Sequence, residues 1–511
     1  MNISYRRRPT GAVHIGHVTI GEGRPVAIQS MTNTPTMDVE ASAAQCLAIA
    51  RAGADIVRLT AQTPTHARVL GDIRSRVRDA GCDIPLVADI HFNPAAAFTA
   101  AEQVEKVRIN PGNFADPGRT FVKLEYTDEE YAAELRRIRD KFKPLLDLCR
   151  ERHTALRIGV NHGSLSDRIM SRYGDTPAGM VESAMEFLRI CRDEHFTDVV
   201  ISIKASNVVV MTTTVHLLVE AMDAEDMHYP LHLGVTEAGD GEDARIKSAV
   251  GIGSLLADGI GDTIRVSLTE APEHEVPVAR MLLDHIATRG AHTAAEGSYE
   301  RREPGSDVPL VIGLDRADVP EGWQHITAAH PDIIGQVRAA ADPSGRIAVT
   351  AVYPTGMSAD EVLIAASVDL GSLLLDGLAD AIEIQAPSLT DDERNTLALG
   401  ILQATRRRIS KTEYIACPGC GRTLYDLQQV LAAVKAATSH LKGLKIGVMG
   451  CIVNGPGEMA DADYGYVGAG PGRVRLYRGK ECVVKNIPSD EALPRLIQLI
   501  KDNGDWRDAD S

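Results

Sequence analysis

Three cysteines in the last hundred residues of the chain have the arrangement of ligands to a metal centre. Cys417 and Cys420 form a C-x-x-C pair, and Cys451 precedes the carboxylate of Glu458. A C-x-x-C turn directs two sulfurs at one point, and thiolates suit zinc or an iron–sulfur cluster. A zinc ribbon would need a second C-x-x-C or a histidine pair, so three cysteines with one carboxylate favour a 4Fe–4S cubane. Thiol redox pairs and zinc knuckles share the motif and remain alternatives.

The other five cysteines are single residues among apolar or helical neighbours. They are Cys46, Cys82, Cys149, Cys191 and Cys482. Free cysteine behaves as a small hydrophobic residue, so we interpret all five as inert buried thiols.

Positively charged residues recur where five short apolar segments end. They are Arg58, Arg108, Arg157, Lys204 and Arg265. If these segments are strands of one parallel barrel, their carboxyl ends share a face and the side chains converge there. The planar guanidinium matches phosphate oxygens, so this set predicts an anionic ligand with more than one phosphate group.

Acid–base groups are predicted at the same face. The candidate catalytic residues are Asp89, His91 and Glu237, and the neutral orienting residues are Asn33, Asn110 and Asn161. Glu237 lies in a loop-forming run directly after an apolar segment. Beside arginines it could be ionised, or it could donate a proton, and the sequence leaves both roles open.

Eight apolar segments between residues 26 and 270 predict the strands that position these groups. They are Val26–Ser30, Ala54–Leu59, Pro85–Ile90, Lys106–Ile109, Leu156–Val160, Val199–Ile203, Leu231–Val235 and Thr263–Ser267. Continuous apolar strands that alternate with helices indicate a parallel sheet buried on both faces. Eight such units in ~250 residues are typical of a (β/α)8 TIM barrel, whereas a doubly wound sheet would gather the polar strand ends at one crevice. We predict an α/β catalytic barrel at residues 1–285.

Two further domains are predicted after the barrel, a barrel-like α/β insert at residues 286–408 and an α+β cluster domain at residues 409–511. Gly371–Gln385 matches Gly253–Ser267 at eight of fifteen positions with a constant offset of 118. An internal repeat explains this match, and convergent helix-to-strand packing is the alternative. The same offset matches Arg265 with Glu383 and Glu237 with Thr355, so the insert is predicted to derive from a barrel and to lack an active site.

The net charge of −16 argues against nucleic acid or an anionic membrane as a partner. We find no window of ~18 apolar residues that would span a membrane. Arg6, Arg7 and Arg8 are followed by no apolar stretch, which argues against a secretory signal. We therefore expect a cytoplasmic protein whose eight cysteines are thiols or ligands and do not form disulfides.

The residues around these positions resemble the 4-hydroxy-3-methylbut-2-enyl diphosphate synthase family of the methylerythritol phosphate pathway of isoprene biosynthesis. The matching runs are SMTNT (30–34), ADIHF (88–92), KVRINPGN (106–113), RIGVNHGS (157–164), SIKASN (202–207), GVTEAG (234–239), IRVSLT (264–269), CPGCGRT (417–423) and GCIVNGPGEMADADYGYVG (450–468). They lie in both the predicted barrel and the C-terminal unit. Compact bacterial members lack a segment like residues 286–408, so the chain is similar to the plant-like type with a shortened insert.

The resemblance implies an iron–sulfur oxidoreductase. Its reaction would be the reductive ring opening and dehydration of 2-C-methyl-D-erythritol 2,4-cyclodiphosphate, with electrons from ferredoxin or flavodoxin. The implied 4Fe–4S ligands are Cys417, Cys420, Cys451 and Glu458. The implied substrate residues are Arg58, Asp89, His91, Arg108, Asn110, Arg157, Asn161, Lys204, Glu237, Arg265 and Ser267. A homodimer is expected, and the sequence does not say whether the cluster domain closes on its own barrel or on a partner's.

Two other functions are compatible with parts of the sequence. A barrel hydrolase or aldolase with a structural zinc knuckle would explain the strand ends and the C-x-x-C pair. An iron–sulfur carrier would explain the cysteines, but it leaves the cationic strand ends without a role.

Overall fold

Eight parallel strands form the closed barrel that the sequence predicts. The strands are β4 (Ala27–Met31), β5 (Ile56–Ala61), β6 (Leu86–Ile90), β7 (Lys106–Ile109), β8 (Ala155–Asn161), β9 (Val199–Lys204), β10 (His232–Leu233) and β11 (Thr263–Ile264). Their order in the sheet is β10-β11-β4-β5-β6-β7-β8-β9, and a parallel bridge from Ile201 to Leu231 joins β9 to β10. The TIM barrel and all eight predicted strands are therefore confirmed.

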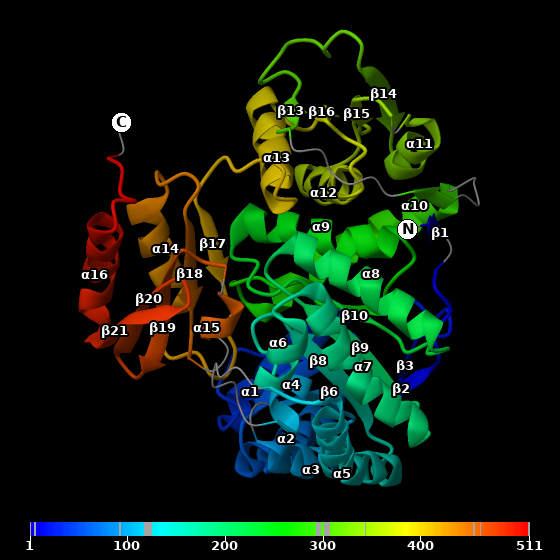
Figure 1. Ribbon diagram of the computed structural model, residues 1–511, viewed down its shortest axis with the longest axis vertical. Coiled ribbons are helices and arrows are strands. Elements are labelled where there is room, and N and C mark those ends of the chain that lie inside the picture. Colours follow the sequence, from blue (N-terminus) through cyan, green and yellow to red (C-terminus); the bar gives the residue numbers. More distant parts are fainter. Residues whose placement is uncertain are drawn as a thin grey trace.

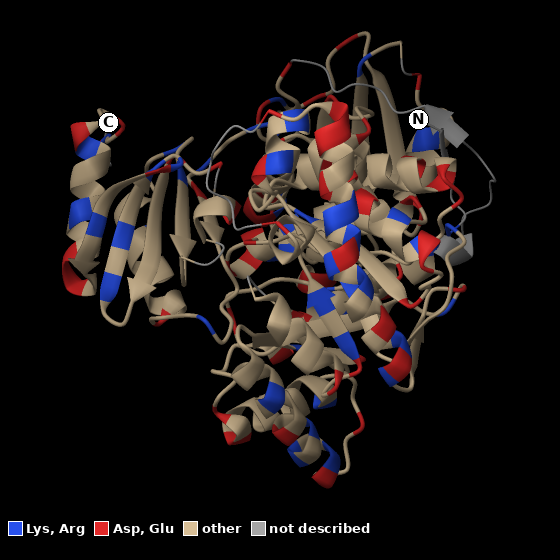
Figure 2. Cartoon of the chain, turned by 60° about the horizontal axis from the view of Figure 1, so that its bottom comes forward, with Lys and Arg blue, Asp and Glu red and all other residues tan. Residues whose placement is uncertain are grey.

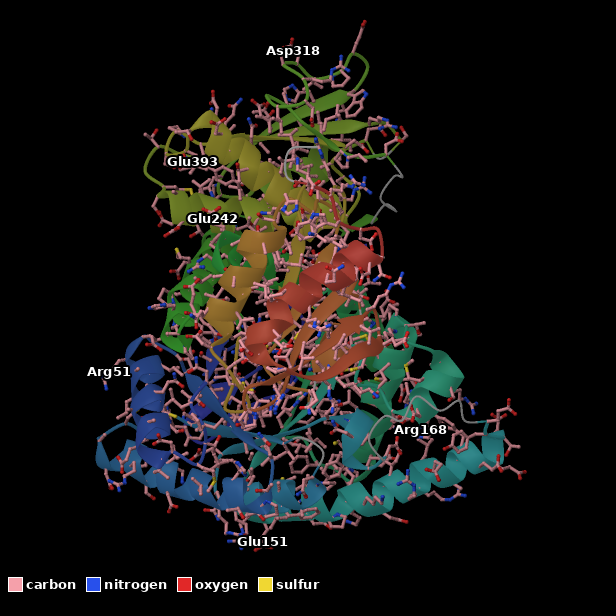
Figure 3. The ribbon with its side chains drawn as sticks, turned by 90° about the vertical axis from the view of Figure 1, so that its left-hand side faces the viewer. Arg51, Glu151, Arg168, Glu242, Asp318 and Glu393 are labelled. Atoms are coloured by element: carbon pink, nitrogen blue, oxygen red, sulfur yellow. The ribbon has the colours of Figure 1, made fainter. Side chains whose placement is uncertain are left out.

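The computed structural model describes residues 2–4, 7–90, 93–116, 125–292, 298–300, 307–342, 344–452, 455–459 and 461–508. Figure 1 shows three units, with the barrel in blue to green, a smaller α/β unit above it in yellow-green, and the C-terminal domain in orange and red beside it. In Figure 3 the C-terminal domain lies in front, with the insert (Asp318, Glu393) above and the barrel (Arg51, Glu151) below.

The barrel helices begin where the sequence supplies capping residues. They are α1 (Val39–Arg51), α2 (Pro64–Asp79), α3 (Pro94–Ala101), α4 (Pro111–Phe114), α5 (Asp128–Arg152), α6 (Asp167–Tyr173), α7 (Pro177–Asp193), α8 (Val208–Ala224), α9 (Gly241–Ala257) and α10 (Glu275–His292), with a short 3-10 helix, η1 (Pro272–His274). Thr63 and Thr176 each accept a backbone N–H and are followed by proline, the residue best suited to the first helical position. The helices pack on the outward-facing residues of the strands in one continuous apolar core.

A hairpin closes the bottom of the barrel. It consists of β2 (Val13–Ile15) and β3 (Val18–Ile20). Val13, Ile15 and Ile20 form an apolar cluster with Val87 and Ala155, which lie at the amino ends of β6 and β8. The lumen above this floor therefore opens only toward the carboxyl ends of the strands.

The insert is built on a four-stranded parallel sheet. Its strands are β13 (Leu310–Val311), β14 (Gln324–Ala329), β15 (Ile347–Val352) and β16 (Ala381–Gln385), in the order β13-β16-β15-β14, with helices α11 (Ile333–Ala340), α12 (Ala359–Leu375) and α13 (Asp391–Ala404). The first strand of the insert lies beside the last, as β4 lies beside β11 in the barrel. The two repeated segments occupy equivalent places, because each runs from the end of a helix (α9 or α12) into a strand (β11 or β16).

The repeated segments also contact each other. A Cβ atom at Gly253 of α9 would lie 2.4 Å from Cγ2 of Val368, and one at Gly371 of α12 would lie 2.8 Å from Cγ2 of Val250. Each glycine and each valine is 118 residues from its counterpart, so the helices pack reciprocally and so closely that neither glycine can carry a side chain. The insert thus docks on the barrel through the segment that the two units share.

The strand register corrects one residue of the predicted repeat. His232 pairs with Thr263 in the barrel, and Ala348 pairs with Ala381 in the insert. The offset is thus 118 on the second strand but 116 on the first, because the insert has two more residues between its strand and its helix. The counterpart of Glu237 is therefore Tyr353 and not Thr355.

The C-terminal domain contains a mixed five-stranded sheet, as expected for an α+β unit. The strands are β17 (Glu413–Ala416), β18 (Lys445–Met449), β19 (Tyr464–Gly470), β20 (Arg473–Arg478) and β21 (Glu481–Pro488), in chain order across the sheet. The helices are α14 (Leu427–Thr438), α15 (Gly455–Glu458) and α16 (Ser489–Asp502). Tyr464, Leu431 and Leu496 are among the residues of its separate apolar core.

The predicted domain limits at 285 and 408 stay a prediction. The last barrel helix, α10, continues to His292, and β1 (Asn2–Ser4) pairs with β12 (Ser298–Glu300) in an antiparallel ribbon. Among the described helices, none combines the length and the apolarity that crossing a bilayer requires. Figure 2 shows basic and acidic residues intermingled along the outer helices.

Candidate active site

A pocket between the open end of the barrel and the C-terminal domain brings most of the predicted site residues together. It encloses about 800 Å³, its opening to solvent included. The barrel contributes Met31, Arg58, Asp89, Arg108, Arg157, Asn161, Ser202, Lys204, Val235, Thr236, Glu237, Arg265 and Ser267. The C-terminal domain contributes Cys417, Pro418, Gly419, Cys420, Arg422, Thr423, Met449, Gly450, Cys451, Gly455 and Glu458. Both sets belong to one chain, so the cluster domain closes on its own barrel.

The closed arrangement is held by contacts at the rim of the pocket. Ala416, next to Cys417, forms a parallel bridge with Ala238, next to Glu237. The Nδ2 group of Asn161 donates to Oε1 of Glu458 at 2.7 Å. The motif that carries the first two cysteines is therefore tied directly to the loop that carries Glu237.

Two glycines allow the domains to approach this closely. A Cβ atom at Gly163 of the barrel would lie 2.0 Å from the carbonyl oxygen of Gly457, and one at Gly457 would lie 2.6 Å from the carbonyl oxygen of Gly163. Any side chain at either position would clash with the backbone of the other domain and displace the C-terminal domain from the barrel mouth.

The predicted cations differ in how their charge is balanced. Arg108 pairs with Asp89 at 3.1 Å, and Arg265 pairs with Glu275 at 2.9 Å. Within the described part of the chain, Arg58 donates only to the sulfur of Met31. The Nε and Nη1 groups of Arg157 contact no hydrogen-bond acceptor among the described residues.

Burial and mutual repulsion act on these cations. Burial, followed by the nearby arginines, lowers the pKa of Lys204 and of Arg157 well below the usual values. Burial also lowers the pKa of Arg58 to about 10, although Asp89 acts in the opposite direction. Such a shift means that the cationic form is disfavoured until an anion arrives. The barrel mouth therefore has the electrostatics of a site for a multiply charged anion.

Glu237 is a carboxyl group of the barrel that lies beside Glu458 of the C-terminal domain. Its φ of 50° is in the left-handed region, which is strained for a residue other than glycine. Its side chain is 4% exposed, and Oε2 has no partner among the residues described. Burial, and then the adjacent Glu458, raise the pKa of Glu237 well above its ordinary value. A buried carboxyl group that keeps its proton can donate it inside the pocket.

The four predicted cluster ligands line the pocket from the C-terminal domain. All three cysteines are free thiols, and the backbone N–H of Gly450 donates to Sγ of Cys417 at 3.2 Å. Within the described part of the chain, no three His, Cys, Asp or Glu side chains converge on a single-ion site. The donor set of three soft thiolates and one carboxylate fits a 4Fe–4S cluster, and Arg422 beside it provides positive charge.

Some predicted residues do not line the pocket. Asn33 exchanges hydrogen bonds with Gln45. Asn110 caps α4 through its Oδ1 and donates its Nδ2 to Oγ of Ser164, so both of its polar groups are used. His91 lies outside the described residues. Of the five cysteines predicted to be buried, Cys82 and Cys482 are only half-buried.

Arg422 is the clearest site residue that the sequence prediction missed. It belongs to the C-terminal domain, yet its Nη1 lies 4.0 Å from Oδ2 of Asp89 in the barrel. Its Nε and Nη1 groups have no hydrogen-bond partner within the described ranges, and its side chain is 9% exposed. The CPGCGRT run contains it, but only domain closure reveals that an arginine two residues after Cys420 reaches the anion site.

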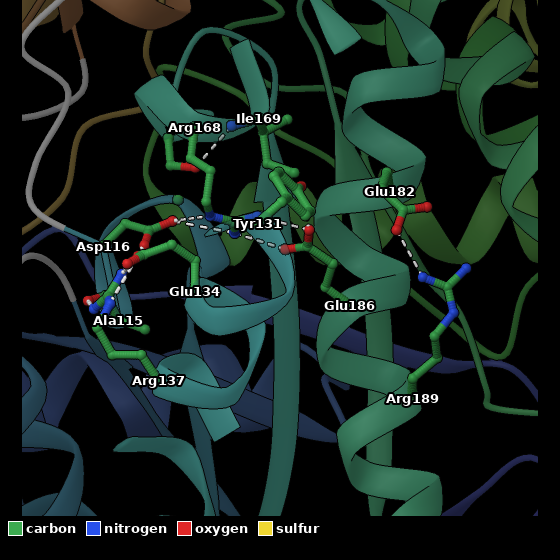
Figure 4. A network of polar contacts seen from close by, with 12 residues as sticks. Ala115, Asp116, Tyr131, Glu134, Arg137, Arg168, Ile169, Glu182, Glu186 and Arg189 are labelled. Atoms are coloured by element: carbon green, nitrogen blue, oxygen red, sulfur yellow. Dashed lines mark hydrogen bonds and ion pairs between the residues drawn. The ribbon is translucent and has the colours of Figure 1, made fainter. Parts of the chain in front are cut away.

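A buried ionic cluster fixes the segment that follows β7. Figure 4 shows Arg168 between Asp116 and Glu186, with Tyr131 donating to the same glutamate. Arg168 bonds Glu186 at 2.6 and 2.7 Å and Asp116 at 3.2 and 3.3 Å. Charge-assisted bidentate bonds of this kind are strong, so the segment from Asn110 to Asp116 is held against α7.

Comparisons with known proteins match both outer domains and nearly the whole length. The GcpE TIM-barrel domain matches residues 10–280, and the GcpE protein C-terminal domain matches residues 413–502. Proteins named 4-hydroxy-3-methylbut-2-en-1-yl diphosphate synthase (flavodoxin) from Bacteroides fragilis and Parabacteroides distasonis are both 50% identical, over 612 and 608 residues. These alignments cover 99% and 98% of this chain and 98% and 99% of the relatives. A protein of the same name from Akkermansia muciniphila is 45% identical over 576 residues, with 99% of this chain and 98% of the relative covered.

Proposed function

The chain belongs to the GcpE family of 4-hydroxy-3-methylbut-2-en-1-yl diphosphate synthases, and we propose that the pocket between its barrel and its C-terminal domain is where it performs that reaction. The substrate is 2-C-methyl-D-erythritol 2,4-cyclodiphosphate. The reaction opens the ring, takes up two electrons and two protons, and releases one water. The observation that carries the proposal is one pocket that joins a cationic barrel mouth to three thiols and a carboxylate.

The cations bind the diphosphate. Among the described residues, no acidic side chain pairs with Arg157 or Lys204, and Arg422 completes the set from the opposite domain. Their unpaired N–H groups can donate to phosphate oxygens, which restores the hydrogen bonds that burial removed. Arg108, held by Asp89 and Asn161, presents its guanidinium in a fixed orientation.

Cys417, Cys420, Cys451 and Glu458 would hold a 4Fe–4S cluster. When bound, such a cluster would supply electrons for the reduction. These four residues lie across the pocket from the cations of the barrel, so a substrate anchored by its phosphates would have its carbon skeleton turned toward them. Closure also limits access of water and oxygen to the reducing site.

Glu237 donates the proton for the oxygen that leaves as water. It lies in the pocket between the cation set and Glu458, and its Oε2 is unpartnered within the described residues. The strained backbone at this position and the bridge between Ala238 and Ala416 tie its orientation to domain closure. Asp89 orients Arg108, and His91 remains a proposed catalytic residue on the basis of its motif.

Flavodoxin or ferredoxin supplies the electrons, and the relatives' names support flavodoxin. A homodimer remains our proposal for the assembly. The insert is proposed to be a plant-like middle domain derived from a barrel, shortened, and without an active site.

Three observations support this interpretation of the insert. The insert sheet has the strand order of a barrel's last three strands followed by its first. The alignment with the Bacteroides fragilis relative has 612 positions against 511 residues here, so at least 101 positions belong to the relative alone. Where the barrel has Glu237 and Arg265, the insert has Tyr353 and Glu383. The hydroxyl of Tyr353 donates to Asp369 at 3.1 Å inside the core of the insert.

An anaerobic turnover assay with a chemical reductant and the cyclic diphosphate tests the proposed function. Protein purified without oxygen should contain iron and sulfide, absorb broadly in the visible range, and form 4-hydroxy-3-methylbut-2-enyl diphosphate only when reductant is present. Release of phosphate without electron consumption would instead support a barrel hydrolase and contradict the proposal.

A further inference from the structure

Lys106 is a buried lysine that the proposed mechanism does not use. It is the first residue of β7, two positions before Arg108, and successive alternate residues of a strand face the same side. Its side chain is 0% exposed, and no hydrogen-bond partner for Nζ exists among the described residues. Lys106 is therefore a buried amine placed below the mouth of the barrel, inside the lumen.

The described residues around Lys106 offer it no counterion. Its two strand neighbours, Val87 and Ala155, belong to the apolar floor that the β2–β3 hairpin seals. Burial, and then the positive charges of Arg157 and Arg58, lower the pKa of Lys106 well below its usual value.

A second buried lysine shows what a structural role looks like in this chain. Lys247 of α9 is 7% exposed, but its Nζ lies 2.9 Å from Oε1 of the buried Glu413. Burying an ammonium group without such a partner is costly, because it loses its hydration and gains no opposite charge. Folding alone therefore gives no reason for a lysine at position 106.

We propose that Lys106 is a positioning residue for the diphosphate substrate. It acts on the negative charge of the substrate through Arg157. This inference rests on the proposed function. Arg157 lines the pocket, and its Nε and Nη1 groups lack partners among the residues described. The Lys106 amine and the Arg157 guanidinium are two buried basic groups without a counterion among the described residues, and the bound diphosphate supplies the negative charge that both lack. The free enzyme thus contains a destabilising buried amine whose charged form the substrate stabilises.

The test replaces Lys106 with methionine, which has a similar length and no charge. Melting temperature is measured on the cluster-loaded protein without substrate, and affinity for the cyclic diphosphate is measured by calorimetry. For Lys106→Met, the melting temperature should rise by about 2–4 °C and the affinity should fall at least tenfold. In an Arg157→Met background, the same substitution should change the affinity less than threefold, because the two residues act together.

Lys247→Met is the matched control, and it should lower the melting temperature and leave the affinity unchanged. Lys106→Gln, neutral but polar, provides a second variant with the same expected loss of affinity. Unchanged affinity in both Lys106 variants, with normal binding by the wild type, would overturn the inference. Failure of the wild-type protein to bind the cyclic diphosphate would overturn the proposed function instead.

Discussion

The chain contains a similar parallel unit twice, and the pocket described above lies at the carboxyl ends of the strands of the first unit, in the barrel. In the barrel, β10, α9 and β11 carry Glu237 and Arg265 at their carboxyl ends. In the insert, β15, α12 and β16 have the same parallel pairing and the same helix-to-strand segment, but carry Tyr353 and Glu383. The backbone arrangement is shared, whereas the side chains that could bind phosphate or donate a proton are not.

The conserved and the altered positions of the two units have different physical roles. Asp262 and Asp380, which correspond, each accept a backbone N–H of the neighbouring strand, from Leu231 at 2.9 Å and from Ile347 at 3.0 Å. These carboxylates fix the strand pairing in both units. The substitutions fall near the carboxyl ends of the strands, where the barrel has its proposed binding and catalytic groups. Under the proposal that the insert derives from a barrel, the comparison teaches that this scaffold persists when its chemistry is lost.

The largest expected effect concerns the cluster, which is proposed to face the barrel mouth and not the insert. Cys451→Ser should abolish both cluster assembly and turnover, since a serine hydroxyl is a poor replacement for a thiolate ligand. Iron and sulfide content and anaerobic turnover measure the two effects. Cys482→Ser is the control and should retain both. Loss of the cluster in Cys482→Ser and its retention in Cys451→Ser would reverse the ligand assignment.

The next effect compares the equivalent positions Glu237 and Tyr353. Glu237→Gln removes the proposed proton donor and should reduce turnover by about 10²–10⁴-fold, the range for general acid catalysis. Tyr353→Phe removes only a hydroxyl from the core of the insert and should leave turnover unchanged at a temperature where the protein is folded. Equal losses in the two variants would mean that the insert has a catalytic role.

The next largest effect should be on the free energy of unfolding, at the interface between the barrel and the insert. Arg338 of the insert bonds Asp258 at 2.8 Å and the corresponding Asp376 at 2.7 Å, and its side chain is 1% exposed. Arg338→Met leaves two buried carboxylates without this partner and should lower the free energy of unfolding by about 3–5 kcal/mol. The exposed pair of Arg346 and Asp307 gives the control, because Arg346→Met should cost no more than about 1 kcal/mol.

The same interface predicts a dependence on pH. Burial acts to raise the pKa of Asp258, but Arg338 and His216 outweigh it and lower the pKa to about 2. A carboxyl group with a depressed pKa in the folded protein stabilises it above the unfolded value of about 4, and this contribution is lost as the pH falls toward 2. Denaturant unfolding between these pH values should show that loss in the wild type and a smaller one in Arg338→Met.

The smallest of these effects is on the affinity for the cyclic diphosphate, and it compares substitutions at the equivalent positions Arg265 and Glu383. Arg265→Ala should weaken binding of the cyclic diphosphate by about 1.5–3 kcal/mol, the range for hydrogen bonds to charged groups. Ser30 still donates to Glu275 at 2.7 Å, so the glutamate keeps one partner and the barrel should stay folded. Glu383→Ala should bind normally. Calorimetry on variants with unchanged circular dichroism measures both, and weaker binding by Glu383→Ala would place a ligand beside the insert.

The sequence could predict those features that depend on local patterns. The alternation of apolar segments and helices predicted all eight barrel strands, and the strand-end rule predicted that Arg58 and Arg265 would meet. The rule fails where a side chain bonds locally, as with Asn110, which caps α4 and does not reach the pocket.

Other features depend on how the domains meet, which no local pattern encodes. Arg422 reaches Asp89, and Asn161 reaches Glu458, only because the C-terminal domain closes over the barrel. The counterpart of Glu237 was misassigned by two residues, because a constant offset assumes that the repeat has no change in loop length.

The central claim is that one chain forms the whole site from its own barrel and its own cluster domain. It is tested by co-expressing two inactive chains, Glu237→Gln and Cys451→Ser, with different affinity tags, and by measuring anaerobic turnover of any mixed dimer. If the site forms within each chain, every site in the mixture has one defect and turnover stays at the level of the single variants. Recovery of about half of wild-type turnover in the mixed dimer, in which one of the two sites would join an intact cluster domain to an intact partner barrel, would contradict the claim.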